Sequence, residues 1–399
     1  MIEIGVSSTN FKRNGPTNCL FAQGVKTIKI LPNRDILVGA GDGTLAKLGA
    51  EHMNIKTASQ VLGGITSISF TNDYTSFFCG TSQCNIYWVD SSTLVPELRN
   101  TCHYEKINDI QFPHGYSDVF ATCSKNDIRI WNAKNRHEIL RLQVPNVECN
   151  CVCFTRDGKK ILSGWDDGKI RAFYPQSGKL MFTINDAHIH GVTALACTSN
   201  CTQIVSGGME GEVRVWKLAN SYQTMQSSMK EHRNRVWSIQ LRANNEQAVS
   251  CSSDGSCIIW DLKTFTRVIC FFESTLFKQV LFHPDESQIL TTGSDRKITY
   301  WGTFDGQIIR MLDGTEDGEI NSLCISKGGN WFMSGGEDKL VRLWGYDDGA
   351  TYYTGTGHAG TINRIAISPD QSTIISVGCE GAVIFWEMPE DCRNNDELH

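Results

Sequence analysis

The sequence contains little proline and no long apolar segment. Only 9 of its 399 residues are proline, and no uninterrupted apolar run is longer than the five residues of Val268–Phe272. A membrane-spanning helix needs about 18 to 20 apolar residues, so none is expected. The first residues, MIEIGVSSTNFKRNGP, contain no apolar core, and we therefore expect no secretory signal peptide.

The sequence also lacks the short motifs of common enzymes and metal sites. It contains no GxxxxGK[ST], HExxH or GxSxG pattern. None of its 16 cysteines forms a CxxC pair, so we interpret them as small core residues with reduced thiols. We expect no metal, no cofactor and no small-molecule substrate. The net charge of −6 gives no general attraction to nucleic acid or to an anionic membrane.

What the chain does have is one short pattern repeated nine times. Each copy is β-rich and ends on an aromatic or apolar residue, and successive ends are 40 to 44 residues apart. The ends are Leu48, Trp88, Trp131, Phe173, Trp216, Trp260, Trp301, Trp344 and Trp386. A period of about 40–45 residues with a terminal tryptophan is typical of WD repeats, each of which forms one blade of a β-propeller. The predicted fold is all-β, a propeller of four-stranded antiparallel blades.

Residues 236–272 illustrate one predicted blade. The segments VWSIQL, AVSCS, CIIWDL and TRVICFF are expected to be its four strands. The pair Asp254-Gly255 predicts a tight turn between the second and third strands, because glycine tolerates a positive φ.

Polar residues recur at fixed places in these repeats. One copy contains His232, Ser250, Asp254 and Trp260, and we predict a buried structural network, because buried polar groups must be paired. By resemblance to WD-repeat proteins, its order is expected to run from His through Ser and Asp to Trp. Two further copies, with Glu210 and Glu380 in the place of the aspartate, contain His188, Ser206, Trp216 and His358, Ser376, Trp386. Because an enzyme needs one site and this set recurs, we predict no catalytic residue and no enzyme activity.

The number of blades in the ring depends on which strand covers the last repeat. The sequence EMPEDCRNNDELH that follows Trp386 offers no fourth strand. Propellers usually take this strand from the beginning of the chain, so that no sheet edge is left open. If Leu94–Cys102 supplies it, the ring has seven blades. If Asn18–Gln23 supplies it, all nine repeats form one ring, and a single ring of eight blades is also open.

We favour seven blades because the first two repeats are weaker. Leu48 replaces tryptophan in the first repeat, and Ser82 replaces the turn acid in the second. The predicted domains are residues 1–93, the last two blades of an upstream propeller that is otherwise missing, and residues 94–388, the seven-bladed ring. Residues 389–399 are predicted to be an acidic mobile tail.

Several longer segments resemble one family of ciliary WD-repeat proteins. These segments include FATCSKNDIRIWNAKNRHEILRLQVPN, GWDDGKIRAFYPQSGKLMFTINDAHIHGVTA, SGGMEGEVRVWKL, SSDGSCIIWDL and TTGSDRKITYWGTFDGQIIRML. They are similar to the second half of the cilia- and flagella-associated protein fifty-two family, and the resemblance covers nearly the whole chain. It implies a non-enzymatic structural protein in the axoneme of motile cilia and flagella, a part of the cytoplasmic cytoskeleton. It also implies binding to tubulin and other luminal proteins inside doublet microtubules near the inner junction, which stabilises the doublet. The alternative is a general cytosolic WD-repeat scaffold, either microtubule-associated or a ubiquitin-ligase adaptor.

Two groups of residues are candidates for binding a partner. Residues 125–179 contain eleven Lys and Arg against six Asp and Glu, and an acidic partner such as tubulin would be attracted there. The basic residues include Lys125, Arg129, Lys134, Arg136, Lys159, Lys160 and Lys169. The second group lies near predicted strand ends and contains Trp165, Arg233, Arg235 and Trp237. Arg129 has a simpler interpretation, since an arginine two positions before the repeat end recurs at Arg171, Arg214 and Arg342 and can serve strand packing alone.

Overall fold

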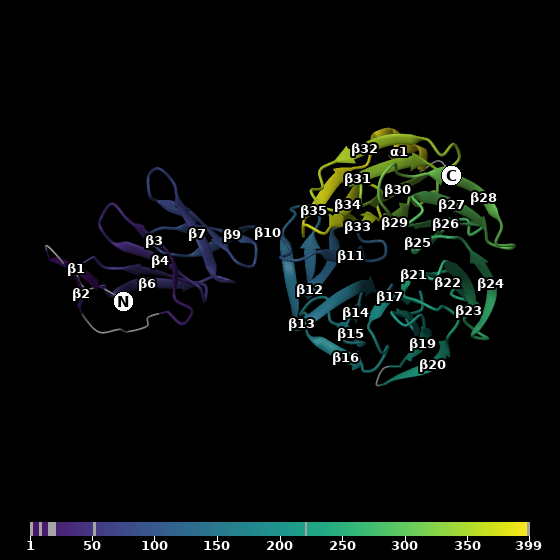
Figure 1. The fold of residues 1–399 in the computed structure, drawn as a ribbon, viewed down its shortest axis with the longest axis horizontal. Helices are drawn as coiled ribbons and strands as arrows, with labels where there is room; N and C mark the ends of the chain where they lie inside the picture. Colours follow the sequence, from purple (N-terminus) through teal and green to yellow (C-terminus); the bar gives the residue numbers. More distant parts are fainter. Residues whose placement is uncertain (1–2, 8–9, 15–20, 51–52, 220–221, 397–399) are drawn as a thin grey trace. The chain divides into compact units, whose positions relative to one another are not determined.

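The structure is a computed structural model that describes residues 3–7, 10–14, 21–50, 53–219 and 222–396. The chain divides into two compact units, residues 1–104 and residues 105–399. Almost all regular structure is antiparallel β-sheet (Figure 1). None of the helices that the structure describes has the length and apolar character needed to span a bilayer.

The C-terminal unit contains six sheets. The first is six-stranded and consists of β11 (Ile107–Gln111), β12 (Val119–Asn132), β13 (Glu138–Phe154), β14 (Ile161–Trp165), β15 (Ile170–Phe173) and β16 (Leu180–Ile184). The second contains β17 (Val192–Cys197), β18 (Gln203–Gly208), β19 (Val213–Leu218) and β20 (Gln223–Met229). The third contains β21 (Val236–Leu241), β22 (Gln247–Ser252), β23 (Ser256–Asp261) and β24 (Thr266–Phe272).

Three further sheets complete this unit. They contain β25 (Phe277–Phe282), β26 (Gln288–Gly293), β27 (Lys297–Gly302) and β28 (Ile308–Asp313); β29 (Ile320–Ile325), β30 (Trp331–Gly336), β31 (Leu340–Gly345) and β32 (Thr351–Thr356); and β33 (Ile362–Ile367), β34 (Thr373–Gly378) and β35 (Val383–Glu387). The last sheet has three strands among the described residues, whereas the four before it have four each.

The six-stranded sheet holds two repeats. The first part of β12 pairs with β11, and its second part pairs with the first part of β13. The second part of β13 pairs with β14. Long strands therefore span two strand positions each, and the C-terminal unit contains seven blades, which we number 1 to 7 in chain order.

The seven blades form a closed ring. The first strand of each blade contacts the first strand of the next, in the order β11, β13, β17, β21, β25, β29 and β33, and β33 contacts β11 (Figure 1). Side-chain amides join neighbours around the axis: Asn108 donates to the Cys149 carbonyl, Asn150 to that of Val192, and Asn363 to that of Ile107, at 2.8, 2.9 and 2.7 Å. The last of these bonds joins blade 7 to blade 1. The ring is therefore tied at its inner edge as well as packed.

The core lies between adjacent blades. Second strands such as β18 and β30 are almost continuously buried, because sheets on both sides cover them. Each interface has its own apolar cluster; that between blades 7 and 1 contains Ile107, Phe120 and Ile375. A propeller core is thus divided into separate layers around the ring.

The N-terminal unit contains two four-stranded sheets that pack on each other. One consists of β3 (Val25–Ile30), β4 (Ile36–Ala40), β5 (Thr44–Leu48) and β6 (Ile55–Gln60), and the other of β7 (Ile65–Phe70), β8 (Ser76–Thr81), β9 (Asn85–Asp90) and β10 (Pro96–Thr101). A separate pair is formed by β1 (Glu3–Ser7) and β2 (Asn10–Asn14). The core between the two larger sheets includes Leu37, Ile65, Phe77 and Val89.

The predicted use of Leu94–Cys102 as the fourth strand of the last blade is wrong. The strand in this segment, β10, pairs with β9, and the division between the units falls after Tyr104 instead of after residue 93. Pairing with the strand just before it closes a short loop, whereas pairing with β35 would close a loop of almost the whole ring at a higher entropic cost. Half of the alternative closing segment, Asn18–Gln23, lies outside the described residues.

Two smaller predictions also need correction. The predicted mobile tail contains a helix, α1 (Glu390–Asp396), whose Cys392 is buried with Met388 in the cluster between blades 6 and 7. The end of the second repeat is Val89 instead of Trp88. In the other repeats the end residue lies five positions after a turn residue with positive φ, as Trp260 follows Gly255, and Val89 follows Cys84 in the same way. Successive strand residues face opposite sides, so Trp88 points away from the core that contains Val89.

Candidate functional site

The polar residues of blade 4 form a buried network. His232 Nε2 lies 2.7 Å from Ser250 Oγ, and Trp260 donates its indole N–H to the same oxygen at 2.7 Å. On the other side of the imidazole, His232 Nδ1 lies 2.7 Å from the hydroxyl of Ser256, which donates a hydrogen bond to Asp254 at 2.5 Å. The order differs from the predicted one, because histidine stands between the acid and the serine. Sequence reasoning missed Ser256. A hydroxyl two residues after a turn aspartate could have indicated it, because such a hydroxyl can donate to the aspartate within the turn.

The same arrangement recurs in blades 3 and 7, with glutamate as the acid. In blade 3, His188 lies 2.6 Å from Glu210 Oε1 and 2.9 Å from Ser206 Oγ, and Trp216 donates to Ser206 at 2.9 Å. In blade 7, His358 contacts Glu380 directly and lies 2.6 Å from Ser376, which accepts from Trp386 at 2.8 Å. The longer glutamate reaches the imidazole without an intervening hydroxyl, which explains why these blades need no counterpart of Ser256.

In blades 1, 5 and 6 the indole at the repeat end also donates to a second-strand hydroxyl. Trp131 donates to Thr122, Trp301 to Thr291, and Trp344 to Ser334, at 2.7, 2.8 and 2.8 Å. Blade 2 has Phe173 at the end position and therefore no indole there. Its Ser163 accepts a hydrogen bond from Trp165 instead, at 2.8 Å. Trp165 has no exposed surface, so its prediction as a partner-binding residue is wrong.

The charges in these networks are stabilised locally. Burial alone would raise the pKa of the Asp254 carboxyl, but hydrogen bonds from His232 and Ser256 hold this pKa well below its usual range. Burial and the hydrogen bond from His188 likewise oppose each other at Glu210, and the pKa of that carboxyl is lowered. Ser250 is completely buried, and its Oγ contacts both His232 and Trp260. It therefore links β22 to β23 and to the segment before β21.

The basic residues of the predicted patch lie at two opposite ends of the blades. We call face 1 the end with the loops between first and second and between third and fourth strands, and face 2 the opposite end. Antiparallel pairing puts these loops at opposite ends of each sheet. Face 1 carries Lys134, Arg136, Arg156, Lys159, Lys160 and Lys179, whereas face 2 carries Lys125 and Lys169 with Arg233 and Arg235. The sequence run therefore makes no single surface, although most of it gathers on face 1.

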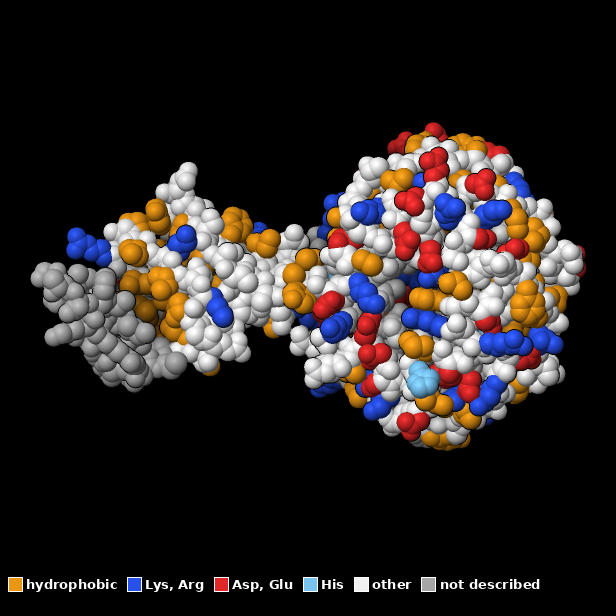
Figure 2. All heavy atoms as spheres, in the orientation of Figure 1, with side chains coloured by type: hydrophobic (Ala, Val, Ile, Leu, Met, Phe, Trp, Pro, Cys, Tyr) orange, Lys and Arg blue, Asp and Glu red, His pale blue; other side chains and the backbone are white. Residues whose placement is uncertain are grey.

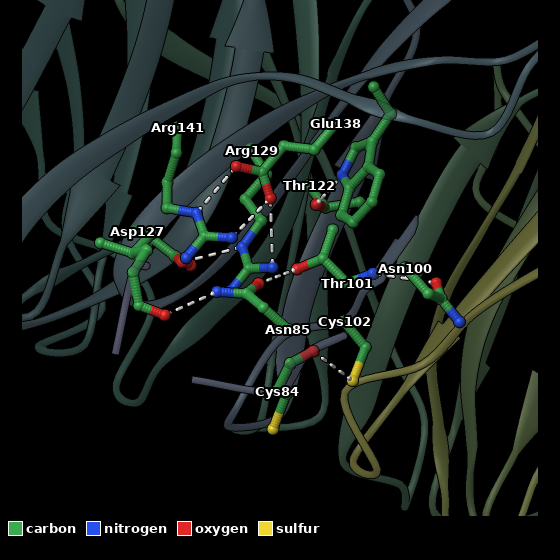
Figure 3. Close-up of polar contacts among 12 residues, drawn as sticks. Cys84, Asn85, Asn100, Thr101, Cys102, Thr122, Asp127, Arg129, Glu138 and Arg141 are labelled. Atoms are coloured by element: carbon green, nitrogen blue, oxygen red, sulfur yellow. Dashed lines mark hydrogen bonds and ion pairs between the residues drawn. The ribbon is translucent and has the colours of Figure 1, made fainter. Parts of the chain in front are cut away.

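Arg129 is not available to a partner. Its side chain is only 2% exposed and pairs with Asp127 at 2.9 Å and with Glu138 at 3.3 Å. Arg141 shares Glu138 at 2.7 Å, so two arginines and two acids form one cluster in blade 1 (Figure 3). The prediction of Arg129 as a partner-binding residue is wrong, and the strand-packing interpretation describes it better.

Several basic residues on face 1 are exposed. Lys159 is 78% exposed, and its Nζ lies 4.0 Å from Asp157 Oδ2. Lys134 pairs with Asp118 at 3.0 Å, but its side chain is 76% exposed. No ion pair is found within the described part of the chain for Arg136, Arg156, Lys160 or Lys179. These side chains are free to meet the acidic groups of another molecule.

The opening of the axial channel on face 2 is a second candidate site. Its cavity has a volume of about 420 Å³ and is lined by Arg235, Trp237, Lys278 and Arg364 among others. Figure 2 shows Lys and Arg side chains around the centre of the ring. Arg235 and Lys278 lie over the Trp237 ring, at 3.8 and 4.4 Å from its centre, and Trp237 donates to Ser253 at 2.5 Å. The predicted residues Arg235 and Trp237 thus lie together, whereas exposed Arg233 lies apart and donates its backbone N–H to Asp254 at 2.7 Å.

Arg364 is a residue that sequence reasoning missed. From blade 7 it donates to Gln279 at 2.9 Å, to the Asn321 carbonyl at 3.0 Å and to the Trp237 carbonyl at 3.3 Å. Burial raises the pKa of Asp109 in the same channel, although Arg364 at 3.5 Å lowers it in part. One side chain of blade 7 thus contacts four other blades across the channel. Among the described residues, no group of His, Cys, Asp and Glu is placed to hold a metal ion.

Comparisons with known proteins match nearly the whole chain. Residues 7–180 match the Nucleolar protein 10-like, N-terminal domain, and residues 178–217, 223–261, 306–345 and 349–387 match the WD domain, G-beta repeat. Cilia- and flagella-associated protein 52 of Chlamydomonas reinhardtii is 47% identical over 390 residues, which are 97% of this chain and 63% of that protein. The proteins of the same name from Sus scrofa and Homo sapiens are 45% and 44% identical over 94% of this chain and 60% of their own length. The chain therefore spans about 60% of the length of these relatives.

Proposed function

Because this chain is a WD-repeat protein homologous over nearly its whole length to Cilia- and flagella-associated protein 52, we propose that it is a non-enzymatic structural protein of the ciliary and flagellar axoneme. In this proposal it binds tubulin and other proteins in the lumen of doublet microtubules, near the inner junction, and stabilises the doublet. The observation that carries the proposal is the identity of 44 to 47% over 94 to 97% of the chain. A ring of blades tied across its channel is a rigid platform, which suits a structural role.

The proposed contact with tubulin is face 1 of blades 1 and 2. Arg136, Arg156, Lys160 and Lys179 lack ion pairs there among the described residues, and Lys159 is exposed. Surface cations without an acidic partner in their own chain can pair with acidic groups of another protein at little cost in lost ion pairs. Arg129, Arg141 and Arg171 are already paired with acids of their own blades and contribute little to this contact.

Sedimentation with purified doublet microtubules tests this contact. The double variant Lys159→Glu, Lys160→Glu is expected to bind at least about ten-fold more weakly, because each change replaces attraction by repulsion. The matched control is Lys125→Glu, Lys169→Glu, which makes the same change in charge on face 2. The control should bind like the unchanged protein.

Three outcomes would count against the proposal. Unchanged sedimentation of the face 1 variant would reject face 1 as the contact. An equal loss for both double variants would show that only net charge matters. Failure of the unchanged chain to sediment with doublets would reject binding to the doublet itself.

A further inference from the structure

Blade 7 has three strands in the part of the chain that the structure describes. Its third strand, β35, pairs with β34 on one side, and no described strand pairs with it on the other. The side chains from Val383 to Trp386 are all half-exposed. At the position of Val383, the other blades carry residues that are at most 6% exposed, namely Ile128, Ile170, Val213, Cys257, Ile298 and Val341. An apolar edge strand of this kind is normally covered in folded proteins.

The other blades show what the fourth strand supplies. In five of them it places a large apolar side chain opposite the residue at the Val383 position, where it joins the cluster against the next blade. The pairs are Ile128 with Leu142, Ile170 with Ile184, Val213 with Met229, Cys257 with Phe271 and Ile298 with Leu312. In blade 6 the residue opposite Val341 is Gly355, and the Trp386 ring lies against it. The cluster between blades 7 and 1 contains no fourth-strand residue.

The neighbouring parts of the chain cannot cover this edge. The strand before the ring, β10, is already paired with β9, and the chain from Thr101 to Ile107 is too short to add another strand. After β35 the chain continues into α1, which packs on the cluster between blades 6 and 7. Within the part of the chain that the structure describes, no segment covers this edge.

One arginine in a groove beside the edge indicates what a molecule bound there carries. The groove has a volume of about 260 Å³, and its charged lining residues are Lys134, Arg136, Asp118, Asp370 and Glu387. Lys134 is already paired with Asp118, so Arg136 is the cation that remains for a bound segment. The guanidinium of Arg136 lies 5.2 Å from the centre of the Phe385 ring, and Arg136 has no ion pair within the described residues. An acidic residue of the bound segment would find its partner there.

We propose that β35 binds an extended segment of a partner protein, which adds as the missing fourth strand of blade 7. The segment runs antiparallel to β35, as fourth strands do in the other blades. It places a large apolar side chain opposite Val383 and an acidic residue near Arg136. Because the strands are antiparallel, the acidic residue precedes the apolar one. This inference deepens the proposed function by giving a shape and a sequence pattern to one partner, and it rests on that function only for the assembly in which the partner is found.

A binding experiment with a defined peptide tests the inference. The probe is a fluorescent peptide with the sequence of the chain's own fourth strand in blade 3, Gln223–Met229, carrying the change Met225→Glu. Met225 pairs with Trp216, so the glutamate would lie opposite Trp386 and near Arg136. We expect saturable binding by fluorescence anisotropy, and slower hydrogen exchange at the amides of residues 383–387 when the peptide is bound.

Matched variants separate strand addition from non-specific adhesion. A peptide with the further change Met229→Asp should bind at least about ten-fold more weakly, because it loses the apolar anchor. The protein variant Arg136→Ala should bind the probe more weakly than the face 2 control Arg233→Ala. Both arginines are exposed, so neither change should affect folding.

Three results would overturn the inference. The first is rapid exchange at residues 383–387 that the peptide does not slow. The second is protection without peptide in a monomer, which would show that the chain covers its own edge. The third is protection that accompanies dimerisation by light scattering, which would assign the edge to a second copy. Since no microtubule is present, these results are independent of the sedimentation test of the proposed function.

Discussion

In the second strand of every blade of the C-terminal unit a hydroxyl faces an indole N–H, whereas the N-terminal unit has neither group at these positions. The hydroxyls are those of Thr122, Ser163, Ser206, Ser250, Thr291, Ser334 and Ser376. In the N-terminal unit the corresponding second-strand residues are Val38 and Cys79, and the repeat ends are Leu48 and Val89. The two groups are present together or absent together, because either one alone would be a buried polar group without a partner.

The two units also differ in how their first strands are covered. In the ring, first-strand residues such as Ile320 and Leu323 are almost completely buried between neighbouring blades. In the N-terminal unit, Ile28 and Ile30 of β3 are 57% and 70% exposed. The same repeat therefore buries its apolar residues only as far as neighbouring sheets allow.

The largest expected effect comes from separating the two units. Residues 105–399 should unfold in one cooperative thermal transition, because every blade has a neighbour on both sides. Residues 1–104 should show no cooperative transition, since two sheets share a single interface and stacked repeats usually need at least about three copies. Differential scanning calorimetry of both fragments measures this. A sharp transition for residues 1–104 would contradict the comparison.

The next largest effect is expected from Ser250→Ala. The change leaves both His232 and Trp260 without their shared partner, which should lower the free energy of unfolding by about 2–4 kcal/mol. Urea unfolding followed by tryptophan fluorescence measures the loss, and the exposed Thr266→Ala is the control. Equal stability of the two variants would show that the buried network contributes nothing.

A smaller effect is expected from Glu212, an acid of blade 3 that lies outside its histidine network. Burial opposes ionisation of Glu212, but Lys230, Arg214 and Ser228 lower the pKa of its carboxyl to about 2. A lowered pKa gives stability that is present above the unfolded value of about 4.5 and is lost as the pH falls towards 2. Glu212→Gln should therefore lower stability at pH 7 by about 1–3 kcal/mol and flatten its decline between pH 4.5 and 2. Parallel pH profiles for the variant and the unchanged protein would contradict this.

The smallest effects come from a matched pair of tryptophans. Trp260→Phe should destabilise the ring by about 1–2 kcal/mol, because Ser250 loses a donor and the smaller ring leaves space. Trp88→Phe should change stability by less than about 0.5 kcal/mol, because Trp88 is half-exposed. The guanidinium of Arg99 lies over its ring, 5.4 Å from the ring centre. Thermal melts of the two variants, compared with the unchanged chain, would show whether position in the repeat or residue type decides the cost.

Much of the candidate site was accessible from sequence because its pattern is local. His232, Ser250 and Trp260 lie at fixed offsets from a turn, and the offsets determine which side chains meet. The predictions for Trp165 and Arg129 were wrong because both judged a residue by its type. Trp165 supplies the indole N–H that Phe173 lacks, and Arg129 lies between two acids, and neither relation follows from the spacing of the repeat.

By itself, the sequence determined the repeat, the antiparallel hairpins and the inward-facing residues, because these depend on strand alternation and on turns within about 40 residues. Only the tertiary structure decided that β10 pairs with β9, that Arg364 joins five blades across the channel, and that no described strand pairs with the free side of β35. Such features depend on competition among segments far apart in the chain. A strand with alternating apolar residues can pair with many sheet edges. The length of the loop to be closed and the neighbouring strands that are available determine which pairing forms.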